Sequence, residues 1–131
     1  MRRTSALLLM SCLGIAPLSA HHSFAVHFVP DERITIEGVV TEFRFRNPHG
    51  LIFLNVGDPD GAEQPWRVET NSPNILRRRG WAPDSIKPGD HVTIEGYPAR
   101  DSARLMRVYR LQFEDGREMI GQRPSVPQDE D

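Results

Sequence analysis

The stretch ITIEGVVTEFRFR, residues 34–46, decides the fold of this 131-residue chain. Apolar and polar residues alternate up to Glu37, Gly38 interrupts the alternation, and apolar residues resume on the shifted phase from Val39 to Phe45. Alternation of this kind is typical of a half-buried β-strand. A glycine at the change of phase indicates a β-bulge, at which a strand bends sharply. The first strand is therefore predicted to be long and to bend at Gly38.

Further strands follow on both sides of a short helix. Residues 51–56 form an apolar run broken only by Asn55, which predicts a strand that is apolar on both faces. Strands are also predicted over residues 65–70, 91–97 and 105–113, and a short sixth strand ends at residue 120. The helix is expected after Asn71 or Ser72 as N-cap, with Pro73 at its first position and Gly80 as its C-terminal stop. In the last long strand we expect Leu105, Tyr109, Leu111 and Phe113 on one face, with Arg107 in the same phase.

An OB-like barrel is expected to have three strands, a short helix and two further strands, with a bend in the first strand. We therefore predict an all-β fold with one short helix, an OB-like antiparallel barrel of five to six strands. A small all-β sandwich would use the same strands with a different closure. The length and the composition, 38% hydrophobic and 26% charged, fit one small globular domain.

The N-terminus has the composition of a secretory signal peptide. Arg2 and Arg3 form a positive region, an apolar run follows, and residues 18–20 resemble a cleavage site. The predicted organisation is a signal peptide over 1–20, one barrel domain over 21–120 and a disordered acidic, proline-rich tail over 121–131. We expect a periplasmic protein whose mature chain has no membrane span. An alternative is lipoprotein processing at Cys12, because LMSC at residues 9–12 loosely resembles a lipobox.

Cleavage after Ala20 changes the chemistry available to the mature chain. It removes the only cysteine, so any metal must be bound by nitrogen and oxygen. It also leaves 14 Lys and Arg against 18 Asp and Glu, a net charge of −4. This balance argues against nucleic acid as a partner, because a phosphate backbone requires a clustered positive surface.

Three histidines form the candidate metal site. A mature chain that begins at His21 offers a metal its α-amine and its ring Nδ1, and His22 adds a third nitrogen. His49 lies in the predicted turn between the first two strands, which borders the usual binding face of an OB-like barrel. Imidazole suits copper, zinc and nickel, and a cysteine-free exported chain favours copper(II). The sequence therefore predicts a transition-metal site at His21, His22 and His49.

Plainer interpretations of these residues stay open. The His21-His22 pair can be a mobile chain end, and residues 47–50 can be simply a turn. We expect His27 to be a packed or rim residue and His91 to be structural. A second hypothesis is a non-catalytic module that binds an unknown periplasmic protein or small ligand through a face that includes Asn47, Trp66 and Glu69. The sequence shows no nucleophile with a neighbouring base and no paired carboxylates, so it names no reaction and favours a protein that is not an enzyme.

Seven short motifs follow one another along the mature chain: AHHSF at 20–24, NPH at 47–49, Trp66 with Glu69, SPN at 72–74, RGW at 79–81, KPGD at 87–90 and GYPA at 96–99. Their order and spacing resemble a family of small exported bacterial proteins of uncharacterised function, over nearly all of the mature chain up to about Glu118. The resemblance implies a periplasmic, single-domain, β-barrel-like protein and carries no established activity, cofactor or catalytic residue. Ser102 departs from the pattern, which has a glycine after Asp101.

We expect the exported protein to begin at His21. Intact-mass spectrometry of protein isolated from the periplasm under non-denaturing conditions measures the N-terminus and any bound metal together. A mass that corresponds to an acylated chain beginning at Cys12 would contradict this expectation.

Overall fold

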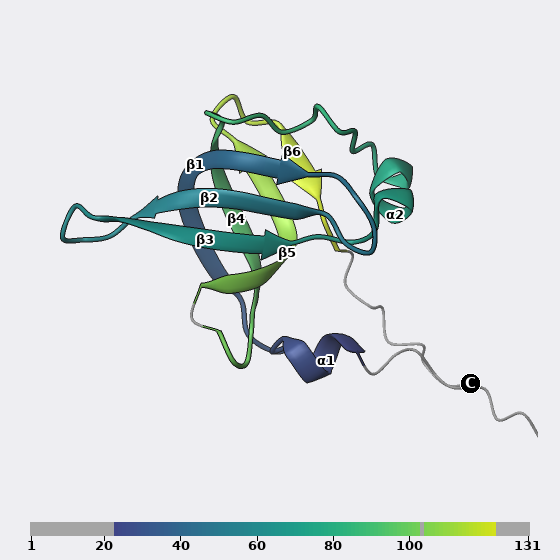
Figure 1. The fold of residues 1–131 in the computed structure, drawn as a ribbon, viewed down its shortest axis with the longest axis horizontal. Helices are drawn as coiled ribbons and strands as arrows, with labels where there is room; N and C mark the ends of the chain where they lie inside the picture. Colours follow the sequence, from purple (N-terminus) through teal and green to yellow (C-terminus); the bar gives the residue numbers. More distant parts are fainter. Residues whose placement is uncertain (1–22, 103, 123–131) are drawn as a thin grey trace, which may run out of the picture.

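A computed structural model describes residues 23–102 and 104–122 (Figure 1). The elements in chain order are α1 (Ser23–His27), β1 (Ile34–Arg44), β2 (Leu51–Gly57), β3 (Glu63–Glu69), α2 (Pro73–Arg78), β4 (His91–Pro98), β5 (Leu105–Phe113) and β6 (Glu118–Ile120). Three strands, a short helix and then the remaining strands is the order predicted from the sequence. No helix within these residues is long and apolar enough to cross a membrane.

The six strands form one sheet that closes on itself. Its order is β3-β2-β1-β4-β5-β6, and β3 also pairs with β5, which closes the first five strands into a barrel. The closing pair β3–β5 is parallel, whereas all other neighbouring strands are antiparallel. β6 adds a short strand to the free edge of β5. The predicted OB-like barrel is therefore confirmed, and α2 lies between β3 and β4 as expected.

β1 bends because it pairs with strands in both halves of the barrel. Gly38 and Val39 pair with β2 on one side and with β4 on the other. A Cβ atom at Gly38 would overlap the carbonyl oxygen of Asn55, so the glycine permits close approach of β2. The bulge itself lies between Val40 and Glu42, so its prediction at Gly38 is wrong. Gly38 lies on the same inward-facing side of β1 as Ile36 and Val40. Because glycine has no side chain, the sequence shows an interruption of the apolar alternation where the strand has none.

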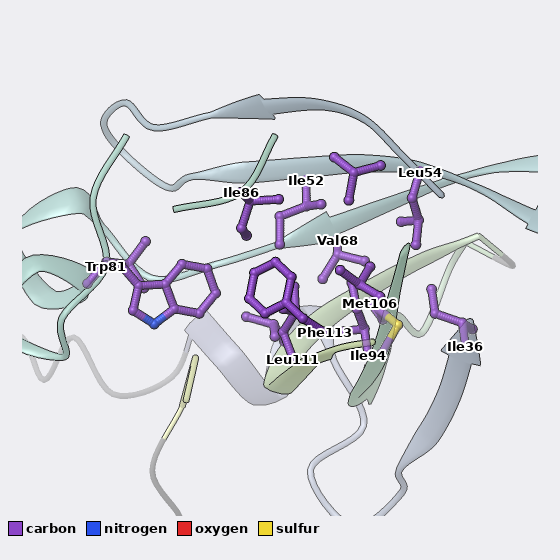
Figure 2. Packing of buried hydrophobic residues seen from close by; sticks show 14 residues of the cluster. Ile36, Ile52, Leu54, Val68, Trp81, Ile86, Ile94, Met106, Leu111 and Phe113 are labelled. Atoms are coloured by element: carbon purple, nitrogen blue, oxygen red, sulfur yellow. The ribbon is translucent and has the colours of Figure 1, made fainter. Parts of the chain in front are cut away.

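The core fills the barrel and extends under α2. Figure 2 shows its buried side chains, contributed by all five barrel strands together with Trp81 and Ile86. In β5 the predicted inward face is only partly correct, since Leu111 and Phe113 are buried but Met106 and Val108 take the inner positions in its first half. The cause is an irregularity in the β4–β5 pairing next to Gly96, which changes the phase of the alternation.

α2 forms where its sequence signals place it. Pro73 is its first residue, and Gly80 follows its C-terminus with a positive φ of 83°, which glycine adopts at little cost. Ser72 is the N-cap by position, although its side chain makes no capping hydrogen bond.

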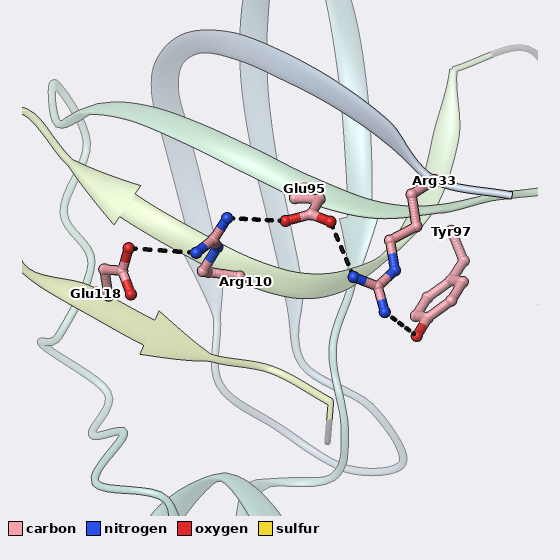
Figure 3. A network of polar contacts seen from close by, with 5 residues as sticks. All are labelled: Arg33, Glu95, Tyr97, Arg110 and Glu118. Carbon is pink, nitrogen blue, oxygen red and sulfur yellow. Dashed lines mark hydrogen bonds and ion pairs between the residues drawn. The ribbon is translucent and has the colours of Figure 1, made fainter. Parts of the chain in front are cut away.

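Charged side chains connect the outer faces of β4, β5 and β6 (Figure 3). The Glu95 carboxylate accepts hydrogen bonds from Arg33 at 3.0 Å and from Arg110 at 3.1 Å, and Arg110 lies 3.6 Å from Glu118. The Arg33 guanidinium also stacks 3.6 Å from the ring centroid of Tyr109. These pairs are partly exposed, so each contributes only about 0.2–1 kcal/mol. Their main effect is to attach Arg33, the residue before β1, to β4 and β5.

The N-terminal segment docks on the loop between β4 and β5, residues 99–104. In α1, Phe24 packs edge-on against Tyr97, with 5.2 Å between ring centroids. The Arg100 backbone N–H donates to the carbonyl of His27, and its side-chain Nε donates to that of Ala25. α1 was not predicted, and these contacts fix it beside a loop that follows it by about seventy residues.

We predict that Gly38→Ala destabilises the protein by about 1–3 kcal/mol, because the added methyl group must displace β2 backbone. Gly57→Ala is the matched control, since a Cβ atom there meets nothing within 4 Å and the backbone has an ordinary φ. Urea unfolding of both variants measures the difference. Equal stability of the two variants would show that Gly38 is not required for the close approach.

Candidate functional site

A pocket of about 450 Å³ lies where the two loops at one end of the barrel meet β3. Its lining combines residues of α1 and the segment after it, the β1–β2 loop, β3, the β4–β5 loop and the start of β5: His27, Phe28, His49, Arg67, Glu69, Asp101, Ser102 and Leu105. In OB-folds this combination of loops and strand face is the usual place for ligand binding. The pocket is therefore the candidate site.

A chain of polar contacts runs from His49 into the barrel wall. His49 Nδ1 lies 2.6 Å from Oε1 of Glu69, and the same oxygen accepts a hydrogen bond from Arg107 Nη1 at 2.5 Å. The second nitrogen of the fork, Nη2, donates to Asn71 Oδ1 at 2.7 Å. The side chains become less exposed along this chain, from 45% for His49 to 21% for Glu69 and 10% for Arg107. Glu69 thus lies between a solvent-accessible imidazole and a buried guanidinium.

The electrostatics of Arg107 follow from its position. Burial lowers the pKa of the guanidinium, and the negative charge of Glu69 acts in the opposite direction. Its Nε is buried without a hydrogen-bond partner, so one donor of the fork is left unsatisfied. Burying this arginine is costly, and the cost is offset mainly by the ion pair with Glu69.

Hydrogen bonds to the end of β6 fix Asn71, the last residue in this series of contacts. The Asn71 side chain donates to the carbonyl of Gly121 at 2.7 Å, Arg79 donates to the same carbonyl, and Trp81 Nε1 donates to that of Ile120. Asn71 is therefore fixed from both ends, and with it the position of Arg107.

This arrangement determines which nitrogen of His49 is available. The 2.6 Å contact places Nδ1 of His49 against the Glu69 carboxylate and leaves Nε2 as the ring nitrogen that a ligand can reach. A carboxylate on one ring nitrogen is the usual partner of a histidine whose other nitrogen binds a metal or moves a proton. His49 is thus oriented as a metal ligand or as an acid–base group.

The predicted site residues fall into three groups. His49 and Glu69 share the pocket. Trp66 packs against the core and lines a separate hollow of about 280 Å³ with Arg104, while Asn47 is exposed in the turn, before a cis peptide bond to Pro48, and does not line the pocket. His21 and His22 lie outside the described residues.

Other site residues were missed in the sequence. Arg67 carried no distinguishing pattern, Ser102 was noted only as a departure from the family pattern, and His27 was expected only as a packed or rim residue. Arg107 could have been found, because it is a charged residue between Met106 and Val108 in an otherwise apolar part of the strand. Within residues 23–102 and 104–122, no three His, Cys, Asp or Glu side chains are grouped so that they could hold a metal ion.

Comparison with known families gives a match over residues 9–106, about three quarters of the chain, to the family of unknown function DUF6152. The chain belongs to this family. The resemblance to an uncharacterised family is thereby confirmed, and export from the cytoplasm stays a prediction for this DUF6152 protein. No protein with curated annotation matches it.

Among solved structures, the DUF6152 protein is similar to the mitochondrial single-stranded DNA binding protein Rim1 of S. cerevisiae. The two are 12% identical, the match covers 63% of this chain and 92% of the other, and the TM-score is 0.43. A likeness of this degree carries no information about ligands.

We predict that Arg107→Met destabilises the protein by about 2 kcal/mol, because it leaves the half-buried Glu69 carboxylate without its arginine. Arg110→Met is the control, since that side chain is 45% exposed and its loss should cost less than about 1 kcal/mol. Urea unfolding measures both. Equal effects of the two substitutions would contradict a special role for the buried pair.

Proposed function

We propose that this DUF6152 protein is an exported, periplasmic protein that binds a transition metal, with copper(II) as the favoured ion. The observation that carries the proposal is the 2.6 Å contact between His49 Nδ1 and Glu69, which directs the lone pair of Nε2 away from the carboxylate. His49 Nε2 then serves as the fixed ligand of the site.

The restraint on His49 is built in two stages. Glu69 orients the imidazole, and the buried Arg107 holds the Glu69 carboxylate in turn. A ligand whose neighbours already fix its orientation loses little conformational entropy when the metal binds. Glu69 therefore acts on the metal through His49 and is not itself a ligand in the proposed site.

The remaining ligands of the proposed site are His21, through its α-amine and ring, and His22. These residues immediately precede α1, whose last residue, His27, lines the same pocket as His49. Ser23, where the described residues begin, precedes His27 by only four residues, so α1 connects the segment that contains the two histidines to the pocket. A set of nitrogen ligands without thiolate favours copper(II) among the common divalent ions.

We predict that the mature chain beginning at His21 binds copper(II), and that either His49→Ala or an extra glycine before His21 weakens binding at least tenfold. Glu69→Gln should weaken it by about 10- to 100-fold, because the imidazole loses its orienting carboxylate. Titration calorimetry with a competing chelator measures the affinities, and electron paramagnetic resonance reports nitrogen ligation.

His91→Ala is the control, because His91 lies at the start of β4 and does not line the pocket. Copper affinity that is unchanged in both His49→Ala and the glycine-extended chain would refute the site. If only the glycine-extended chain loses affinity, the metal is bound by the N-terminal histidines alone and His49 is not a ligand.

A further inference from the structure

The pocket is much larger than a metal ion requires. One water molecule takes about 30 Å³ in the liquid, whereas the pocket measures about 450 Å³ and falls within the range of about 300–1,000 Å³ found for small-molecule sites. A metal at His49 would occupy one part of it. The remainder has room for an organic molecule.

The lining of the pocket defines the chemistry of such a molecule. Arg67 is exposed, and no ion pair joins it to another described residue. The planar fork of an arginine matches carboxylate and phosphate groups. Beside it, Leu105 and Phe28 supply apolar surface. A cation next to an apolar wall suits a ligand that has an anionic head and an apolar body.

The lining of the pocket contains two carboxylates besides this cation. Glu69 is already paired with Arg107 and His49, so its charge is engaged within the barrel wall. Asp101 is exposed in the β4–β5 loop, and it contributes the one further carboxylate of the lining. His27 and Ser102 add groups that can donate hydrogen bonds to an oxyanion.

Backbone pairing fixes the walls relative to one another. Arg67 pairs with Leu105 across the parallel β3–β5 closure, so the cation and the apolar wall are neighbours in one ladder. Phe28 forms a β-bridge with Ala99 at the start of the β4–β5 loop. The pocket is therefore preformed, which lowers the entropic cost of binding.

From these observations we propose that the pocket binds a small organic oxyanion, a carboxylate or phosphate ester with an apolar body, whose head contacts Arg67 and whose body packs on Leu105 and Phe28. The binding needs no metal, so it stands or fails separately from the proposed copper site.

The test titrates chelator-treated mature protein with 3-phenylpropionate, phenyl phosphate and the uncharged 3-phenylpropanamide, followed by amide chemical shifts in NMR spectra. At least one oxyanion should bind with a Kd in the millimolar range or tighter, at least fivefold more tightly than the amide, with shifts concentrated at His49, Arg67 and Leu105. Arg67→Gln should remove this preference, whereas Arg104→Gln, which lines the separate hollow with Trp66, should keep it.

Equal binding of the amide and the oxyanions, no binding of any probe, or full retention of the preference in Arg67→Gln would each overturn the proposal. Arg67 is exposed, so the variant should keep the wild-type unfolding temperature. Copper titration of Arg67→Gln separates the two sites, because loss of oxyanion binding with unchanged copper affinity assigns Arg67 to the organic ligand alone.

Discussion

The parallel pairing of β3 with β5 is the constraint on which the rest of the structure depends. It consists of three residue pairs, and the middle one, Val68 with Met106, is fully buried in the core. The pairs on either side, Arg67 with Leu105 and Glu69 with Arg107, point to the opposite face. The same short ladder therefore closes the barrel on its inside and forms a wall of the pocket on its outside.

A contribution to stability does not by itself explain why the Glu69–Arg107 pair is buried. Replacing such a pair with apolar residues is often neutral or stabilising, because the cost of removing two charges from water matches their attraction. Arg107 also leaves one buried donor without a partner. What the pair does achieve is a carboxylate fixed in position 2.6 Å from His49. Orienting the His49 imidazole is therefore the role that explains why the buried pair is present. The hydrogen bonds from Asn71 and Arg79 to the Gly121 carbonyl extend this restraint to the end of β6.

The sequence predicted the elements of the fold well, because each one is encoded locally. Alternation marked the strands, and Pro73 and Gly80 marked the ends of α2. Predictions that depended on distant pairing were less accurate. The bulge in β1 lies after Val40, not at Gly38, because a glycine required by the approach of Asn55 looks the same in sequence as a glycine at a bulge. Likewise, the irregularity next to Gly96 changed which residues face inward in the first half of β5. Of the site, His49 and Glu69 could be named from sequence, but the contacts that join them to each other and to Arg107 follow from barrel closure.

The docking of α1 has a consequence for the order in which the molecule is completed. Its anchors, Pro98, Ala99 and Arg100, are made about seventy residues after it, and Arg107 follows later still. A nascent chain that ends before β5 contains His49 and Glu69, yet it has neither the guanidinium that restrains the carboxylate nor the loop that completes the pocket. α1 therefore reaches its final position only with the last strands, and the pocket is complete only when β5 has joined the sheet.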